Sequence, residues 1–159
     1  MYAILTENDI SQWNDISGVK YHFPKRYRDY LLPGTKVIFY KGTLKNAEFK
    51  NKRLSSLPHY FAYGVIARVE KDPQSNKNDF YAFFSEYKKF QRAVLAKEGG
   101  RFIEEIPATR KKNYWRDGVR QINEKIFFAI MNKSDLDITH GEVGSESKCE
   151  YSEGDTLSI

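Results

Sequence analysis

The sequence predicts one α+β domain, a small, curved, mixed β-barrel with flanking helices rather than a doubly wound parallel sheet. Three observations predict it. The chain has 159 residues, which is enough for one hydrophobic core and too few for two ordinary domains. Short runs rich in aromatic and β-branched residues follow one another, with little helical periodicity between them. Aromatic residues make up 15% of the chain, so there is ample material for a core.

The first part of the chain predicts one strand, a long irregular stretch and one helix. Tyr2–Leu5 is an apolar run typical of a short buried strand. Residues 10–18 are predicted as a helical turn or loop, and residues 18–24 as a loop, because they follow neither period. Residues 25–32 are expected to form a short basic helix that stops at Pro33.

The middle of the chain predicts three strands. Lys36–Lys41 is dense in β-branched and aromatic residues, and residues 60–69 and 80–84 form a predicted hairpin. Gly64 inside the first hairpin strand indicates a bulge or a close backbone approach. Residues 43–57 hold several cations and few apolar positions, so we expect an exposed basic loop.

The last part predicts strand fragments and then a helix. Residues 87–106 are predicted as fragments around a turn at Gly99. An apolar stripe at helical spacing then favours a C-terminal helix with Arg120 on its polar side. The stripe consists of Val119, Ile122, Ile126 and Ile130. Because Phe128 points away from the stripe, a final strand at residues 126–131 is the alternative.

Charge divides the chain into two regions. Residues 1–134 contain 25 basic and 14 acidic residues, a net charge of +11, whereas residues 135–159 contain one basic and seven acidic residues, a net charge of −6. A basic body with interleaved aromatic residues is typical of a nucleic-acid-binding domain, and ordinary solvated surface charge is the alternative. The acidic tail is a linker, a solubilising end or a shield for the basic face.

The sequence offers little for catalysis. The longest apolar run, Tyr60 to Ala67 with Gly64 included, is far short of the roughly 20 residues of a membrane-spanning helix. The first residues do not resemble a secretory signal, so we expect a cytoplasmic protein that does not enter a membrane. Cys149 is the only cysteine, which excludes an internal disulfide. The histidines are scattered and no phosphate loop is present, so we expect no enzyme, no metal and no cofactor.

One cluster combines aromatic and cationic side chains. Tyr21, His22 and Phe23 are followed directly by a basic segment, residues 25–28. Flat side chains stack on nucleobases and adjacent cations neutralise phosphates, which is what a pocket for an extruded base requires. The alternative is that Phe23 and Tyr27 are core residues.

Several motifs resemble the EVE-like members of the PUA superfamily. They are Trp13-Asn-Asp15, Gly18, Tyr21–Pro24, Arg26-Tyr27, Pro33–Gly42, Tyr60–Ile66, Tyr81-Ala82 and Tyr87–Phe90. More closely, the chain is similar to the modified-base-reading domains found N-terminal to HNH nucleases and in other modification-dependent restriction proteins. The resemblance covers roughly residues 1–130, and it indicates the fold more securely than the substrate.

The resemblance implies a PUA-like barrel, related to the YTH readers, that takes a flipped, modified base of DNA into an aromatic pocket. It places Trp13, Tyr21, His22, Phe23, Phe39, Tyr40 and Lys41 around that pocket. The basic segments add predicted phosphate contacts at Lys25, Arg26, Arg28, Lys45, Lys50, Lys52 and Arg53. A nuclease or helicase partner, separate or fused, is expected. Ala62 stands where the family has glycine, and no His-Asn-His segment is present, so cleavage is not implied.

Three other functions remain open from the sequence. PUA-like domains also bind RNA, and no residue here distinguishes RNA from DNA. A small hydrolase would use His22 or His59 with a carboxylate, but it lacks a recognisable nucleophile. A protein-interaction module would use the acidic tail on a basic partner.

Overall fold

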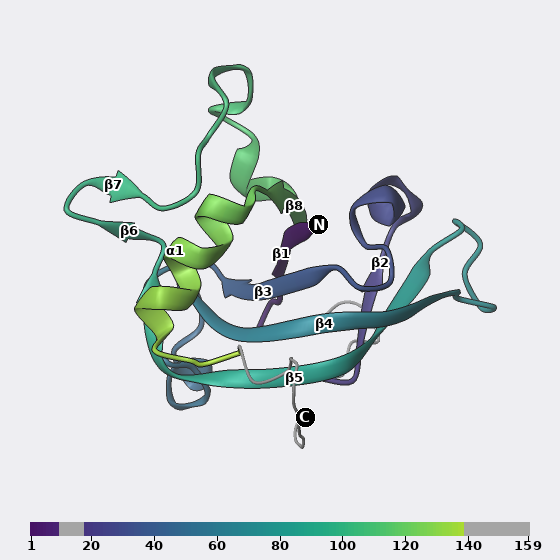
Figure 1. Cartoon of the computed structure of the whole chain (residues 1–159), viewed down its shortest axis with the longest axis horizontal. Helices are drawn as coiled ribbons and strands as arrows, with labels where there is room; N and C mark the ends of the chain where they lie inside the picture. Colours follow the sequence, from purple (N-terminus) through teal and green to yellow (C-terminus); the bar gives the residue numbers. More distant parts are fainter. Residues whose placement is uncertain (10–17, 139–159) are drawn as a thin grey trace.

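The computed structural model describes residues 1–9 and 18–138 as a curled sheet with one α-helix packed against it (Figure 1). The strands are β1 (Tyr2–Thr6), β2 (Lys20–Phe23), β3 (Lys36–Lys41), β4 (His59–Lys71), β5 (Phe80–Leu95), β6 (Lys97–Glu98), β7 (Arg101–Phe102) and β8 (Val119–Ile122). The helix is α1 (Glu124–Ser134), and the 3₁₀ turns are η1 (Lys25–Tyr30), η2 (Ala47–Lys52), η3 (Ala108–Arg110) and η4 (Tyr114–Arg116).

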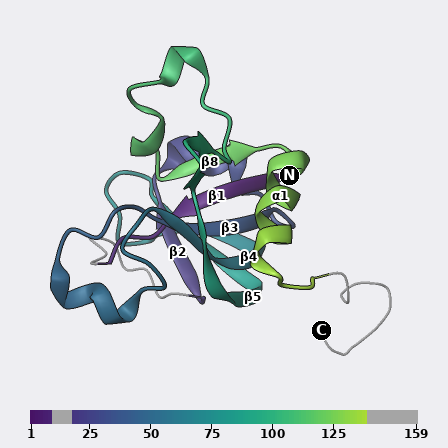
Figure 2. The same ribbon diagram turned by 90° about the vertical axis from the view of Figure 1, so that its left-hand side faces the viewer.

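The main sheet has the strand order β2-β5-β4-β3-β1-β8. Strands β1 and β3 pair in parallel, and all the remaining strand pairs in this sheet are antiparallel. Figure 2 looks along the sheet, so that β8, β1, β3, β4 and β5 follow one another with α1 at one side. The prediction of a small, curved, mixed sheet is therefore confirmed, and the sheet forms a half-barrel.

Bulges bend the two long strands. The register between β4 and β5 shifts between Tyr60 and Ala62 and again on either side of Ile66, and each shift increases local twist and curvature. A Cβ atom at Gly64 would lie 3.2 Å from the backbone oxygen of Glu86. The predicted close backbone approach at this glycine is confirmed.

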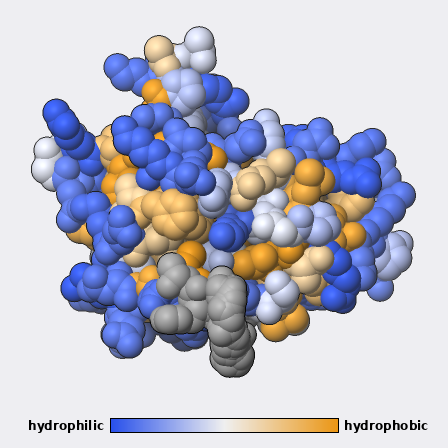
Figure 3. Space-filling model, in the orientation of Figure 1, coloured by the Kyte–Doolittle hydropathy of each residue, from blue (hydrophilic) through white to orange (hydrophobic). Residues whose placement is uncertain are grey.

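Two hydrophobic clusters lie on opposite faces of the sheet. In β1, Ala3 and Leu5 belong to one cluster and Ile4 to the other, because successive side chains of a strand alternate. The second cluster includes the buried face of α1. Figure 3 shows apolar residues that reach the surface beside α1 and β4, framed by hydrophilic residues.

The C-terminal helix is confirmed, but it is shorter than predicted. The Asn123 side chain accepts a hydrogen bond from the Ile126 amide at 2.8 Å, and this N-cap starts the helix at Glu124. Residues 119–122 form strand β8 instead, paired with β1, and Arg120 is buried rather than on a polar helix face. In β8, Val119 and Ile122 lie on opposite faces and belong to different hydrophobic clusters, so both are buried at a spacing that the sequence pattern assigned to a helix.

Two other predictions were wrong in detail. Residues 20–23 are a strand rather than a loop, because the backbone of β2 pairs with β5. Residues 87–95 are the second half of β5 rather than separate fragments, since the bulges disturb the alternation on which a strand prediction depends. The turn at Gly99 and Gly100 is confirmed between β6 and β7, and both glycines have positive φ.

Within residues 1–9 and 18–138, none of the helices has the length and apolar character needed to cross a membrane. Within the same ranges, no three metal-ligating side chains lie together.

Candidate functional site

A cavity with a volume of about 750 Å³ opens where β1 and β3 end. Because these two strands are parallel, their carboxyl ends meet at the same edge of the sheet. The lining residues are Thr6, Glu7, Asn8, Asp9, Tyr40, Lys41, Gly42, Thr43, Lys45, Asn46, Phe49, Arg53, Pro58, Phe102 and Trp115. The volume falls within the roughly 300–1,000 Å³ of ordinary ligand sites. We call it the main cavity.

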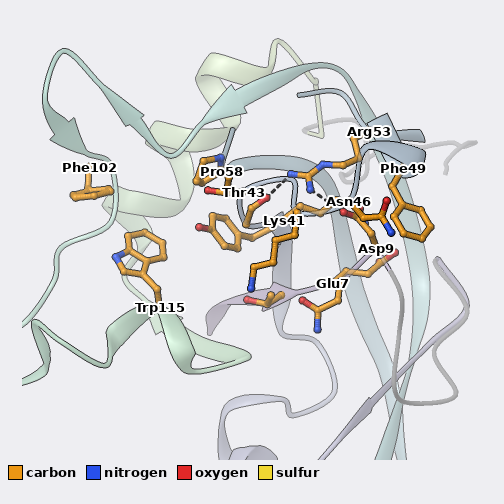
Figure 4. Close-up of a pocket in the computed structure, with 15 residues that line it drawn as sticks. Glu7, Asp9, Lys41, Thr43, Asn46, Phe49, Arg53, Pro58, Phe102 and Trp115 are labelled. Carbon is orange, nitrogen blue, oxygen red and sulfur yellow. Dashed lines mark hydrogen bonds and ion pairs between the residues drawn. The ribbon is translucent and has the colours of Figure 1, made fainter. Parts of the chain in front are cut away.

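Three aromatic side chains form one wall of the main cavity. The rings of Tyr40 and Trp115 stack with centroids 5.5 Å apart and an interplanar angle of 27°, and Phe102 lies 5.2 Å from Trp115. Phe102 is 43% exposed and Trp115 is half-buried, so ring surface remains open to a ligand. Figure 4 shows Phe102 and Trp115 at one end of the cavity and Phe49 at the other. We call Tyr40, Trp115 and Phe102 the aromatic wall.

A buried arginine supports the aromatic wall from behind. The Arg120 guanidinium carbon lies 4.7 Å from the Tyr40 ring centroid and 4.8 Å from that of Trp115. Its Nε and Nη2 each donate to the carboxylate of Glu104 at 2.8 Å. The planar guanidinium is thereby fixed in orientation, and so are the rings that stack on it.

The carboxylate of Glu104 is fully satisfied. The hydroxyls of Tyr60 and Tyr114 each donate to it at 2.7 Å. Burial first, and then the Glu104 charge, raise the pKa of both tyrosines, so both hydroxyls stay protonated and donate. Burial alone would lower the pKa of Arg120, but Glu104 raises it. Glu104 is 2% exposed, whereas the neighbouring Glu105 is exposed to solvent.

A second ionic group borders the main cavity opposite the aromatic wall. Asp9 accepts from Lys41 Nζ at 3.2 Å and from Arg53 Nη1 at 2.8 Å. Burial would raise the pKa of Asp9, yet the hydrogen bonds and charges of these two cations lower it. The Arg53 side chain is only 2% exposed and also donates to the carbonyls of Ser55 and Gly42. It fastens the basic loop to the sheet, so its donors are engaged within the protein.

The predicted pocket residues are divided between two neighbouring cavities. Tyr40 and Lys41 line the main cavity, whereas residues 21–23 line a third cavity of about 290 Å³ together with Arg26. Trp115 lines both cavities, as do Thr6 and Asn8. The structure therefore brings the two predicted groups together around a residue that the sequence analysis did not select.

Several predicted pocket residues are core residues. Phe23 and Phe39 are each 1% exposed, and the interpretation of Phe23 and Tyr27 as core is confirmed. The Tyr21 hydroxyl donates to the carbonyl oxygen of Thr6 at 2.9 Å, a contact that fixes the chain. His22 lies 3.0 Å from Asp72 through Nε2. Trp13 lies outside the described residues.

Most of the predicted phosphate contacts are exposed. Lys25, Arg26 and Arg28 lie on η1, and Lys45, Lys50 and Lys52 lie on or before η2. Arg53 differs from them, because its side chain is almost fully buried. Of the six exposed cations, Arg26 lines the third cavity and Lys45 lines the main cavity.

Sequence reasoning missed Trp115, Phe102, Glu104 and Arg120. A signal was present in residues 110–116, where four cations surround an adjacent Tyr-Trp pair. This is the same interleaving of aromatic and cationic residues that selected residues 21–28. The partnership of Glu104 with Arg120 has no comparable signal, because 16 residues separate the two and no period connects them.

No protein-family model and no curated protein sequence matches this chain. Its fold is similar to that of the N-terminal domain of McrB from Staphylothermus marinus, with a TM-score of 0.51 and 13% sequence identity. The likeness covers 83% of this chain and 93% of that one. At this identity it shows a shared fold.

Proposed function

We propose that this chain is a non-catalytic reader of DNA that carries a modified base, and that the main cavity accepts that base after it is flipped out of the duplex. The observation that carries the proposal is the aromatic wall, with open ring surface on one side of a cavity whose other side holds Lys41 and Lys45. An extruded base needs stacking surface, polar groups for its edge and cations for its phosphate.

The aromatic wall is prepared for stacking before a ligand arrives. Arg120 occupies one side of the Tyr40 and Trp115 rings, and its own orientation is fixed by Glu104. A base that stacks on a fixed ring loses less affinity to side-chain ordering than one that must first immobilise the ring. Stacking of this kind contributes about 1–3 kcal/mol per base.

The exposed cations on η1 and η2 suit contacts to the DNA backbone. They include Lys50 and Lys52 on η2 and Arg28 on η1. Such contacts are independent of sequence, release condensed counterions and position the duplex. Recognition of the modification is assigned to the main cavity, and general affinity to these cations.

The resemblance to base-reading domains of restriction proteins and the fold likeness to an McrB N-terminal domain both support a role in modification-dependent restriction. In this role the chain supplies recognition only. Cleavage is assigned to a nuclease, and a nuclease or helicase, separate or fused, is the proposed partner that acts on DNA in the cytoplasm.

The test is a binding comparison at one stated salt concentration. Matched duplexes carry 5-methylcytosine, 5-hydroxymethylcytosine, glucosylated cytosine, N6-methyladenine or no modification, and a matched RNA duplex serves as a further probe. We expect one modified DNA duplex to bind at least tenfold more tightly than the unmodified one. Equal binding to all DNA duplexes would overturn the proposal, and a preference for the RNA would replace it with the RNA-binding alternative.

A further inference from the structure

A second cavity, of about 410 Å³, lies next to the main cavity and shares Glu7, Lys41 and Arg53 with it. The remaining lining residues are Asn51, Lys52, Leu54, His59, Phe61, Tyr87, Lys89 and Phe90. Its volume lies within the range of ordinary small-ligand sites, about 300–1,000 Å³. Neither the aromatic wall nor the bound-base proposal uses this space. We call it the second cavity.

The second cavity contains a buried imidazole with an unused acceptor. His59 is 0% exposed, and its Nδ1 lies 2.7 Å from the carbonyl oxygen of Leu57. A carbonyl only accepts, so Nδ1 carries the hydrogen and Nε2 presents a lone pair. Among the described residues, Nε2 has no hydrogen-bond partner. Buried polar atoms normally have a hydrogen-bond partner, so we expect Nε2 to accept a hydrogen bond from a donor outside the chain.

The charge of the second cavity favours an anion. Its lining includes four cations and one carboxylate. Lys41 and Arg53 are already paired with Asp9, but within residues 1–9 and 18–138 no ion pair engages Lys52 or Lys89. Both of these lysines are exposed. They are free to meet a negatively charged group at the mouth of the cavity.

The inner lining is apolar and partly aromatic. Phe61 and Phe90 are buried, and Leu54 at the rim is 45% exposed. The ammonium group of Lys41 lies 5.4 Å from the Phe61 ring centroid. Such a surface suits a flat, apolar ring system better than a hydrated ion.

These features together identify the class of ligand. An inorganic anion would satisfy the lysines, but it offers mainly acceptors, and Nε2 of a neutral imidazole also accepts. Burial, the largest cause, lowers the pKa of His59, so the ring stays neutral near pH 7. The ligand must therefore combine a negative charge with an N–H donor on a flat ring.

We propose that the second cavity is a nucleotide subsite, in which a phosphate meets Lys52 and Lys89 and the N–H group of a base donates to Nε2 of His59. Every nucleobase has such a donor. The ligand comes either from the DNA strand, beside the flipped base, or from free mononucleotide. The first source rests on the proposed function, and the subsite itself does not.

The experiment follows the ring nitrogens of His59 by NMR in the intact chain. The probes are inorganic phosphate, dGMP and a short unmodified single strand. We expect dGMP and the strand to shift the Nε2 signal of His59, and phosphate alone to leave it unchanged. A strand that acts at concentrations at least tenfold below dGMP identifies DNA as the source, and tighter binding of dGMP identifies free nucleotide. No shift with either nucleotide, or an equal shift with phosphate, would overturn the subsite.

Two variants sharpen the result. Lys89→Ala should weaken the strand-induced response about threefold or more, whereas Lys125→Ala, an exposed lysine on α1, should leave it unchanged. His59→Phe removes the acceptor and should weaken binding about tenfold. If His59→Phe does not fold, the NMR titration of the wild-type chain still tests whether the subsite binds a nucleotide. All probes are unmodified, so this outcome is independent of any preference for a modified base.

Discussion

Residues 21–28 and residues 110–120 have similar compositions, yet the structure uses them in opposite ways. In the first segment the aromatic residues, such as Phe23, are buried in the core and the cations are exposed. In the second segment Arg120 is 3% exposed and Trp115 borders the main cavity. Composition therefore marks both segments as candidates, but it does not show whether the aromatic residues or the cations of a segment face a ligand.

The difference has a specific cause. A buried cation is tolerated only when a buried anion and further hydrogen bonds compensate its lost hydration. Glu104 supplies this compensation for Arg120, and Tyr60 and Tyr114 complete it. Within residues 1–9 and 18–138, no ion pair with a carboxylate engages the cations of η1, and Arg26 and Arg28 remain exposed over the rings of Tyr27 and Phe80.

The largest expected effect comes from breaking the buried ion pair. Glu104→Ala leaves Arg120 charged and buried without its partner, so we expect the free energy of unfolding to fall by about 3–5 kcal/mol. Chemical denaturation measures this loss. The matched control is Asp117→Ala, which breaks the more exposed pair with Arg110 and should cost less than about 1 kcal/mol. Equal losses in the two variants would show that the Glu104 pair is no more important than a surface pair.

Two tyrosine-to-phenylalanine variants compare the segments directly. Tyr114→Phe removes a donor to a carboxylate, and we expect a loss of about 1.5–3 kcal/mol. Tyr21→Phe removes a donor to backbone carbonyls and should cost about 0.5–1.5 kcal/mol. Thermal and urea unfolding of both variants gives the two values. A larger loss for Tyr21→Phe would reverse the comparison.

Replacing the exposed ring of the aromatic wall tests the functional side of the comparison. Trp115→Ala should weaken binding to the preferred modified duplex by about ten- to a hundredfold, because one stacking surface is lost. Binding to unmodified duplex should barely change. Phe128→Ala, an exposed aromatic residue on α1, is the control and should bind normally. A stably folded Trp115→Ala protein that keeps its full preference would remove the aromatic wall from the site.

Much of the fold could be predicted from the sequence where a strand is buried on both faces and therefore forms a nearly continuous apolar run. Lys36–Lys41 and the hairpin around Gly64 have clear patterns, and both are confirmed. Residues 119–122 were assigned to a helix because Val119 and Ile122 continue a helical spacing, whereas in β8 these residues lie on opposite faces of a sheet that is covered on both faces. Residues 119–122 form a strand because they pair with β1. This contact joins distant parts of the chain, so it cannot be predicted from a local sequence pattern.

The candidate site could be predicted only in part, for a similar reason. Lys50 and Arg53 look alike in the sequence, and Arg53 becomes structural because Asp9, 44 residues away, meets it. Tyr40 was selected from its strand, whereas Phe102 and Trp115 come from the segment between β5 and β8. Convergence of such distant residues depends on the tertiary fold.

The smallest expected effect concerns the exposed cations of the first segment. If Arg28 contacts a phosphate, Arg28→Ala should reduce the slope of log affinity against log salt concentration by about 0.9, which is about three- to fourfold in affinity between 50 and 200 mM salt. The loss should be the same for modified and unmodified duplexes, because phosphate contacts contain no base information. Arg68→Ala is a close control, since this exposed arginine also lies over a phenylalanine ring but belongs to β4, whereas Arg28 belongs to η1, whose residues Arg26 and Tyr27 line the third cavity. A slope that falls equally in both variants would mean that the protein's overall charge, and not the position of η1 beside the third cavity, determines binding. A preference for the modified base that changes only in Arg28→Ala would place this residue in recognition, and the two segments would then share that role.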